Sequence, residues 1–311
     1  MDSIEKTIFG LIRVARPVHW TKNIAVFAGI VFAGQLFEKA QMTRVIEAFI
    51  TFCLASSATY VINDILDRNR DRMHPIKKHR PIASGVISIP LALAFASGLV
   101  LSSLFLASRI SDLFTFMILG YLLLQAAYSL YLKHIAVVDI MVIATGFVLR
   151  IYAGAYIIDA HLSVWFLLCV ISTALFLASG KRRAELGAIG ATGETRKSLV
   201  GYNKEALNSY VTMFGNASWM SWALFTFFES PRASEPLVLF LSEISRTTTI
   251  NKLLMITIPV AIFGIMRYQG LISSERTEAP EKILLKDVSL VTAIAIWVGI
   301  VLIVYYGGVT G

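Results

Sequence analysis

The chain has 311 residues, of which 56% are hydrophobic and only 15% are charged, and its formal net charge at pH 7 is +8. Long apolar runs recur along the whole sequence, and this pattern excludes a water-soluble globular domain. We therefore predict an all-α, polytopic protein of the inner or plasma membrane, folded as one domain over residues 1–311.

The first predicted element is a short amphipathic helix at about 4–14, which would lie at the inner membrane surface. Nine membrane spans follow, read as apolar runs with few or no charges. In chain order they are 24–37, 45–62, 86–107, 113–132, 135–158, 162–179, 206–228, 253–266 and 288–306. The first and the eighth have only 14 uncharged residues each, so they must extend into flanking residues to cross about 30 Å of hydrocarbon.

Lysines and arginines predict the orientation of these spans. With the N-terminus in the cytoplasm, the cytoplasmic segments hold 21 of the 28 basic residues and the outer segments hold 6. Leaving out the span at 253–266 would spoil this asymmetry. Basic inner loops can anchor to anionic lipid, and no nucleic acid is expected as a partner.

A polar segment, NDILDRNRDRMHPIKKHRP at 63–81, follows the second predicted span. If the helix continues through it, four oxygen-bearing side chains fall within about 100° of one another around the axis. They are Asn63, Asp64, Asp67 and Asp71. Pro75 predicts that this helix ends just beyond Asp71.

Three carboxylates and an amide on one helical face suit Mg²⁺, which would in turn hold a diphosphate. The basic residues that follow from Lys77 to Arg80 supply donors for phosphate groups. The alternative is that the aspartates only form ion pairs with neighbouring arginines at a solvated helix end.

The pattern N-D-x-x-D-x-x-x-D resembles the first aspartate-rich motif of the UbiA superfamily of intramembrane transferases. That resemblance implies a nine-helix fold, and in most members a second acidic motif in the other half of the protein. After the sixth predicted span, however, this chain reads SGKRRAEL at 179–186, with one carboxylate, Glu185. A basic triplet therefore stands where the second acidic motif would be.

Within this superfamily the chain resembles the decaprenyl-phosphate phosphoribosyltransferase branch. The matching stretches are RPVHWTKN (16–23), NDILDRNRDRMHPIKKHRPIASG (63–85), YSLYLKHIAVVDIMVIATGFVLRIYAG (128–154), SGKRRAEL (179–186) and MRYQGL with EAPEKILLKD (266–287). The resemblance implies Mg²⁺-dependent transfer of 5-phosphoribose from phosphoribosyl diphosphate to a polyprenyl phosphate. Pyrophosphate would be released, and the product would serve arabinose-donor or cell-envelope glycan synthesis.

The resemblance also implies roles for individual residues. Asp64, Asp67 and Asp71 are the predicted catalytic residues, and with Asn63 they are the predicted metal ligands. The predicted contacts of the donor phosphates are Lys22, Lys77 and Arg80, and those of the acceptor phosphate are Lys181, Arg182 and Arg183, although the two sets could be interchanged. Further substrate-binding candidates are Asn23, Tyr128, Lys133, Asp139, Arg150, Glu185 and Arg267.

Several of these candidates have a structural alternative. Asp139 and Arg150 lie in the fifth predicted span, where ionised groups are costly, so each could be a buried partner of another span. Tyr128 could belong to an interfacial aromatic belt, and Arg267 could extend its charge to the membrane surface.

Two other functions are open at this level. A prenyltransferase acting on an aromatic or tetrapyrrole acceptor should carry the second acidic motif. A transporter could line its path with Asp139 and Arg150, but its charges should be spread through discontinuous helices. Here the polar residues gather at one membrane face, which favours an enzyme with a cytoplasmic active site. A homo-oligomer is possible.

Overall fold

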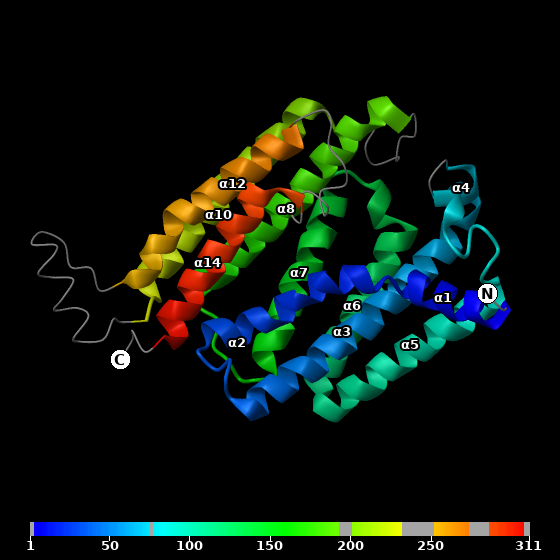
Figure 1. Ribbon diagram of the computed structural model, residues 1–311, viewed down its shortest axis with the longest axis horizontal. Coiled ribbons are helices and arrows are strands. Elements are labelled where there is room, and N and C mark those ends of the chain that lie inside the picture. The colour runs from blue at the N-terminus through cyan, green and yellow to red at the C-terminus, as the bar shows by residue number, and fades with distance from the viewer. Residues whose placement is uncertain (1–2, 75–76, 193–200, 232–251, 274–285, 308–311) are drawn as a thin grey trace, which may run out of the picture. The chain divides into compact units, whose positions relative to one another are not determined.

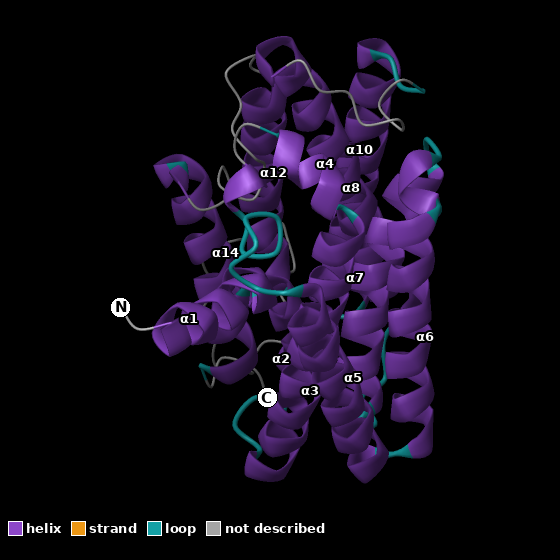
Figure 2. Cartoon of the chain, turned by 90° about the vertical axis from the view of Figure 1, so that its right-hand side faces the viewer, coloured by secondary structure: helices purple, strands orange, loops and turns teal. Residues whose placement is uncertain are grey.

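The computed structural model describes residues 3–74, 77–192, 201–231, 252–273 and 286–307, and every regular element within these ranges is a helix (Figures 1 and 2). The chain forms two compact units. The first contains residues 1–132 and 149–161, and the second contains residues 133–148 and 162–311. Helix α7 (Val138–Tyr156) contributes its beginning to the second unit and its end to the first.

The first unit is built around the long helix α3. Its elements are α1 (Ser3–Ala15), the 3-10 helix η1 (Pro17–Phe27), α2 (Ala28–Phe32), α3 (Lys39–Leu66), α4 (Arg68–Met73), the 3-10 turn η2 (Lys77–His79), α5 (Ile89–Ile110), α6 (Asp112–Leu130) and the end of α7. The 3-10 turn η3 (Leu132–His134) has its first residue in this unit and its other two in the second. Helix α3 packs against η1, α5 and α6, and it lies beside α5 in Figure 1. Phe52, Phe114 and Tyr121 are fully or almost fully buried in its core.

Serine side chains set where two of these helices begin. The hydroxyl of Ser88 accepts a hydrogen bond from the backbone N–H of Leu91 at 3.4 Å, and that of Ser111 accepts one from Phe114 at 3.1 Å. Such caps satisfy backbone donors that a helix start leaves without partners. Ser111 also separates α5 from α6.

The second unit holds the start of α7 and the remaining long helices. They are α8 (Val164–Thr192), α10 (Lys204–Phe228), the 3-10 helix η4 (Leu253–Ile256), α12 (Thr257–Ser273) and α14 (Val288–Tyr306). Helix α8 packs along α10, and α12 packs along α14, as Figure 1 shows. Asn203 and Asp287 cap α10 and α14, with the backbone N–H of Ala206 at 2.6 Å and that of Leu290 at 2.9 Å.

Among the described residues, seven helices are long and apolar enough to cross a membrane. They are Lys39–Leu66, Ile89–Ile110, Asp112–Leu130, Val138–Tyr156, Val164–Gly187, Leu253–Ser273 and Val288–Tyr306. The all-helical membrane architecture predicted from the sequence is therefore confirmed. The predicted helix at 4–14 is also present, as α1, whereas its place at the membrane surface stays a prediction.

Two of the nine predicted spans are not among these seven. At 24–37 the structure has the end of η1 and then the five-residue α2, which at about 1.5 Å per residue is too short to cross. This segment lies directly against α7, because a Cβ atom at Gly154 would collide with the carbonyl oxygen of Val26. At 206–228 the structure has α10, which is 25 residues long but carries polar residues along its length.

Candidate functional site

The acidic segment is not one continuous helix, and this corrects the sequence prediction. Helix α3 ends at Leu66, Asp67 lies between the two helices with φ −87° and ψ 1°, and α4 begins at the next residue. The end predicted from Pro75 is confirmed, because α4 stops at Met73 and His74 has extended geometry. The break at Asp67 divides the predicted carboxylate face into two groups.

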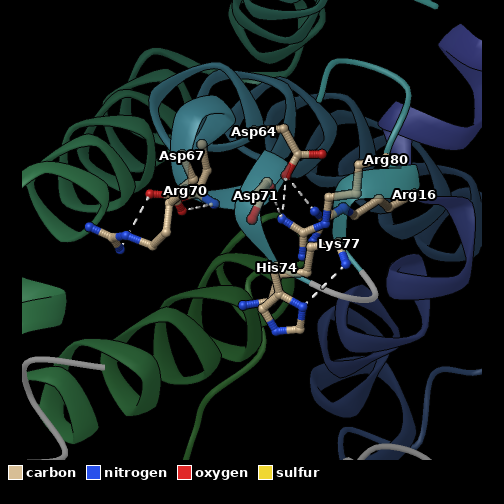
Figure 3. A network of polar contacts seen from close by, with 9 residues as sticks. Arg16, Asp64, Asp67, Arg70, Asp71, His74, Lys77 and Arg80 are labelled. Carbon is tan, nitrogen blue, oxygen red and sulfur yellow. Dashed lines mark hydrogen bonds and ion pairs between the residues drawn. The ribbon is translucent and has the colours of Figure 1, made fainter. Parts of the chain in front are cut away.

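Asp64 and Asp71 converge on the guanidinium group of Arg80 (Figure 3). The Nη1 atom of Arg80 lies 3.1 Å from Oδ1 of Asp64 and 2.6 Å from Oδ2 of Asp71. Both aspartates are only 3% exposed. Arg16 joins the same cluster, since its Nη2 atom lies 2.5 Å from Oδ1 of Asp64. The two buried carboxylates therefore share the guanidinium group of Arg80 as an ion-pair partner.

Asp67 forms the second group, on the other side of the view in Figure 3. Its Oδ2 atom accepts a hydrogen bond from Nδ2 of Asn63 at 3.1 Å, and Nη1 of Arg70 lies 3.8 Å from its Oδ1. Within the described part of the chain, no three histidine, cysteine or acidic side chains converge as a metal site. The structure thus places the four predicted metal ligands in two pairs, Asp64 with Asp71 at Arg80 and Asn63 with Asp67.

The donor atoms at this point fit a hard divalent cation. Carboxylate oxygens are the ligands that Mg²⁺ prefers in proteins, and those of Asp64 and Asp71 both lie within hydrogen-bond distance of one nitrogen atom. The guanidinium group of Arg80 lies between the two carboxylates, so this position already stabilises a positive charge. The two carboxylates are accordingly suited to bind a divalent cation as well as a guanidinium group.

Sequence analysis missed Arg16 as a member of this cluster. Its backbone is left-handed, with φ 53° and ψ 60°, and its guanidinium carbon lies 5.2 Å from the ring centroid of Tyr60. The one local signal is that Pro17 follows it, because a residue before proline is disfavoured in a right-handed helix. Nothing local indicates that Asp64, 48 residues away, is its partner.

Asn23 and Arg150 meet in the interior of the first unit. The Nε atom of Arg150 donates to Oδ1 of Asn23 at 2.7 Å, and its Nη2 atom donates to the hydroxyl of Tyr121 at 2.7 Å. Nδ2 of Asn23 donates in turn to Ser56 at 3.1 Å. Asn23 is fully buried and Arg150 is 5% exposed, so both side chains are held by protein groups. Lys22, which precedes Asn23 in the sequence, is partly exposed.

The basic triplet of the second unit is mostly engaged with other side chains. Nε of Arg182 forms an ion pair with Oδ2 of Asp139, and its Nη1 atom forms one with Glu185. Arg182 and Asp139 are both fully buried. Nε of Arg183 donates to Oδ1 of Asn208 at 2.6 Å, and Arg183 is only 3% exposed.

Tyr202 completes this buried cluster. Its hydroxyl donates to Oδ1 of Asp139 at 2.6 Å and accepts the backbone N–H of Val137 at 2.5 Å. Val137 has φ 69°, a conformation that β-branched residues rarely adopt. Burial, followed by donation to Asp139, raises the pKa of Tyr202, so this hydroxyl stays a proton donor across the neutral range.

The remaining predicted residues lie in several places. Lys181 is partly exposed on α8, Lys133 is 3% exposed at η3, and Tyr128 is partly buried near the end of α6. The backbone N–H of Lys77 donates to Nδ1 of His74 at 3.3 Å. Arg267 binds both carboxylate oxygens of the helix-capping residue of α14 and lowers the pKa of that carboxyl group. Most of the predicted EAPEKILLKD stretch lies outside the described residues.

Comparisons with known proteins agree with this helical architecture. The UbiA prenyltransferase family matches residues 23–180. The chain is 36% identical to the decaprenyl-phosphate phosphoribosyltransferase of Mycolicibacterium smegmatis, over 94% of this chain and 91% of that protein. It is 33% identical to the protein of the same name from Corynebacterium glutamicum, over 96% and 87% of the two chains.

Solved structures give the same fold. A UbiA homolog from Archaeoglobus fulgidus bound to GPP and Mg²⁺ superposes with a TM-score of 0.68 at 18% identity, over 95% of this chain and 99% of that one. A structure of digeranylgeranylglyceryl phosphate synthase superposes with a TM-score of 0.65 at 17% identity, over 99% and 100% of the two chains. The apolar helices, the matched family and the near full-length relatives together lead to one conclusion: this chain is an integral membrane transferase that belongs to the UbiA prenyltransferase family.

Proposed function

We propose that this protein transfers 5-phosphoribose from phosphoribosyl diphosphate to a polyprenyl phosphate and releases pyrophosphate. The observation that carries this proposal is the similarity to two decaprenyl-phosphate phosphoribosyltransferases over nearly the whole chain. The fold alone supports only the family, because the solved neighbours are below 20% identity. We assign the chemistry to residues of the acidic segment and of the basic triplet.

The donor carries its diphosphate on the anomeric carbon, so its bond breaks toward an oxocarbenium-like sugar and the diphosphate leaves. We assign Mg²⁺ binding to Asp64 and Asp71, with Asp67 and Asn63 as the other predicted ligands. Bound Mg²⁺ would neutralise the charge that grows on the leaving group. Lys22, Lys77 and Arg80 are assigned to the phosphate groups of the donor.

The acceptor phosphate is already an anion and needs positioning more than a strong general base. We assign it to the basic triplet, with direct contact by Lys181, which is the partly exposed member. Arg182 and Arg183 are buried and already bonded to Asp139, Glu185 and Asn208, so their part is to hold this turn of α8 in place.

We further propose that the chain crosses the membrane nine times with its N-terminus in the cytoplasm. The two additional crossings would be α10 and the predicted span at 24–37, which contains the end of η1 and α2. The excess of basic residues in the predicted cytoplasmic segments supports this orientation. The acidic segment would then face the cytoplasm, and the product would enter cell-envelope glycan synthesis.

Prenyl transfer is the second candidate, because UbiA homologs with the same fold bind GPP and DMAPP in solved structures. That reaction in this family uses a second acidic motif, which the sequence SGKRRAEL does not supply. Its one carboxylate is Glu185, which forms an ion pair with Arg182. The basic triplet in place of a second acidic motif favours pentosyl transfer over prenyl transfer.

The test is incubation of purified protein with radiolabelled phosphoribosyl diphosphate, Mg²⁺ and polyprenyl phosphate. We expect label to enter the organic phase with the unmodified protein and not with Asp64→Asn. Asp112→Asn removes an exposed carboxylate at the start of α6 and should retain transfer. Label that stays aqueous with every acceptor length, together with transfer from a labelled prenyl diphosphate to an aromatic acceptor, would overturn the proposal.

A further inference from the structure

The acidic cluster of the first unit contains as many guanidinium groups as buried carboxylates. Two carboxylates, Asp64 and Asp71, face two guanidinium groups, Arg16 and Arg80, at 2.5 to 3.1 Å. Burying carboxylates is costly unless they are paired, and these two are 3% exposed. The arginines are more accessible, with side chains 22% and 29% exposed. The negative partners are therefore buried, while the positive partners reach toward solvent.

We propose that Arg16 and Arg80 are resident counter-ions of Asp64 and Asp71, which a divalent cation displaces when the diphosphate arrives, so that metal and diphosphate bind as one unit. This inference rests on the proposed function and adds Arg16 to the site. It also gives Arg80 two successive partners, first the carboxylates and then a phosphate.

The geometry requires such an exchange. A cation bound by both carboxylates would occupy the point where Nη1 of Arg80 now lies, within 3.1 Å of each. Two cations cannot share that point, because like charges a few ångströms apart in a partly buried site repel each other strongly. Arg80 must leave, and the Oδ1 atom of Asp64 must weaken its bond to Arg16.

The displaced guanidinium groups would remain near the carboxylates because both backbones are anchored; that of Arg80 is bonded to Lys77 at 2.9 Å and to Ser84 at 2.8 Å. On the N-terminal side of η1, the hydroxyl of Ser57 donates to the carbonyl of Ala15 at 2.9 Å, and Nε1 of Trp20 donates to the same hydroxyl at 3.0 Å. Further along η1, Asn23 is held by Arg150. Arg16 lies between these anchors, and its described side-chain contacts are Asp64 and the ring of Tyr60.

A guanidinium group that leaves a carboxylate can pair equally well with a phosphate, because both present two oxygens to its planar fork. Metal binding alone therefore breaks ion pairs without replacing them, whereas metal and diphosphate together restore them. By linkage, each ligand must then raise the affinity for the other by the same factor. Removal of one arginine should strengthen metal binding alone and reduce this coupling.

The experiment measures Mn²⁺ binding by the loss of the free-ion signal in electron paramagnetic resonance, with and without inorganic pyrophosphate. The samples are the full-length purified protein and its Arg16→Gln and Arg80→Gln variants. We expect Mn²⁺ alone to bind each variant about tenfold more tightly than the unmodified protein, within the usual range of coupling effects, and pyrophosphate to improve Mn²⁺ binding less. Arg16→Lys keeps the charge and should stay near the unmodified protein.

Arg109→Gln is the matched control, because it removes the same charge from an exposed side chain in the last turn of α5, outside the acidic segment. Unchanged or weaker Mn²⁺ binding in both glutamine variants at Arg16 and Arg80 would overturn the inference, as would equal tightening in Arg109→Gln. If Arg16→Gln does not elute as a folded protein, Mn²⁺ binding by Arg80→Gln alone tests the inference. The Mn²⁺ assay contains no phosphoribosyl diphosphate and no polyprenyl phosphate. If Mn²⁺ and pyrophosphate strengthen each other's binding as expected but label transfer fails, the result would count against the proposed function only.

Discussion

The two units each contain a cluster of arginines and carboxylates, and the clusters differ in what is exposed. In the first unit the carboxylates of Asp64 and Asp71 are buried, while Arg16 and Arg80 are about a quarter exposed. In the second unit Arg182 and Asp139 are both fully buried, and Tyr202 holds the remaining oxygen of Asp139. The first cluster can therefore exchange its cations for others, whereas the second is a fixed structural element.

This difference also explains why similar residues carry different roles. A partly exposed arginine loses little when it leaves a carboxylate, because water or a phosphate can replace its partner. An arginine without solvent contact has no such replacement, and its separation would leave two buried charges. We therefore expect substitutions in the two clusters to affect different quantities, which are ligand binding in the first unit and folding in the second.

The largest effect on stability should come from Arg182→Ala, which leaves Asp139 as an uncompensated buried charge. We expect the free energy of unfolding to fall by about 3–5 kcal/mol. Arg16→Ala should lower it by at most about 1 kcal/mol, because that side chain is partly exposed. Thermal unfolding in detergent would compare the two variants. Equal losses of stability would contradict the distinction between a fixed and an exchangeable cluster.

A comparable effect on activity should come from Asp71→Asn. Substituting a residue that only supports a metal ligand typically costs about 10- to 100-fold in metal affinity or activity. We therefore expect substitution of a predicted ligand itself to reduce label transfer by at least about 100-fold. The fold should be retained, because Arg80 keeps Asp64 as a partner. Asp139→Asn is the comparison, and it should lower the unfolding temperature instead. Full transfer by Asp71→Asn would remove the metal assignment.

A smaller effect is expected for Tyr202→Phe, which leaves the N–H of Val137 and one oxygen of Asp139 without their partner. The cost should be about 1–3 kcal/mol of unfolding free energy. Adding Val137→Gly should recover part of it, since glycine adopts the left-handed conformation without the penalty of about 1–2 kcal/mol that other residues incur. A double variant less stable than Tyr202→Phe would show that this turn is not strained.

The smallest effect should appear at Asp287, whose pKa is lowered by the hydrogen bond from Arg267 and by the backbone N–H of Leu290. A carboxyl group with a lowered folded-state pKa contributes stability above its unfolded value, near 4, and this contribution is lost as the pH falls through the folded pKa. Asp287→Asn should therefore lower stability slightly at neutral pH and leave it unchanged at the acid end, which flattens the profile between them. Unfolding temperatures between pH 3 and 7 would measure this difference.

Local rules predicted part of the candidate site. Asp64 and Asp71 are seven residues apart, which places them on the same side of a helix two turns apart, and they do converge. Asp67 was expected on the same face, yet the break at this residue turns it toward Asn63 and Arg70. The sequence also indicated the membrane helices, since long apolar runs have no other stable environment.

The sequence by itself determined that the chain is helical and membrane-embedded and where its carboxylates are concentrated, because these properties depend on residues that are neighbours along the chain. Only the tertiary structure decided which cation each carboxylate meets. Arg16 is 48 residues from Asp64, and Tyr202 is 63 residues from Asp139. Such partners follow from packing between distant helices, and packing also sets the exposure that separates an exchangeable cluster from a fixed one.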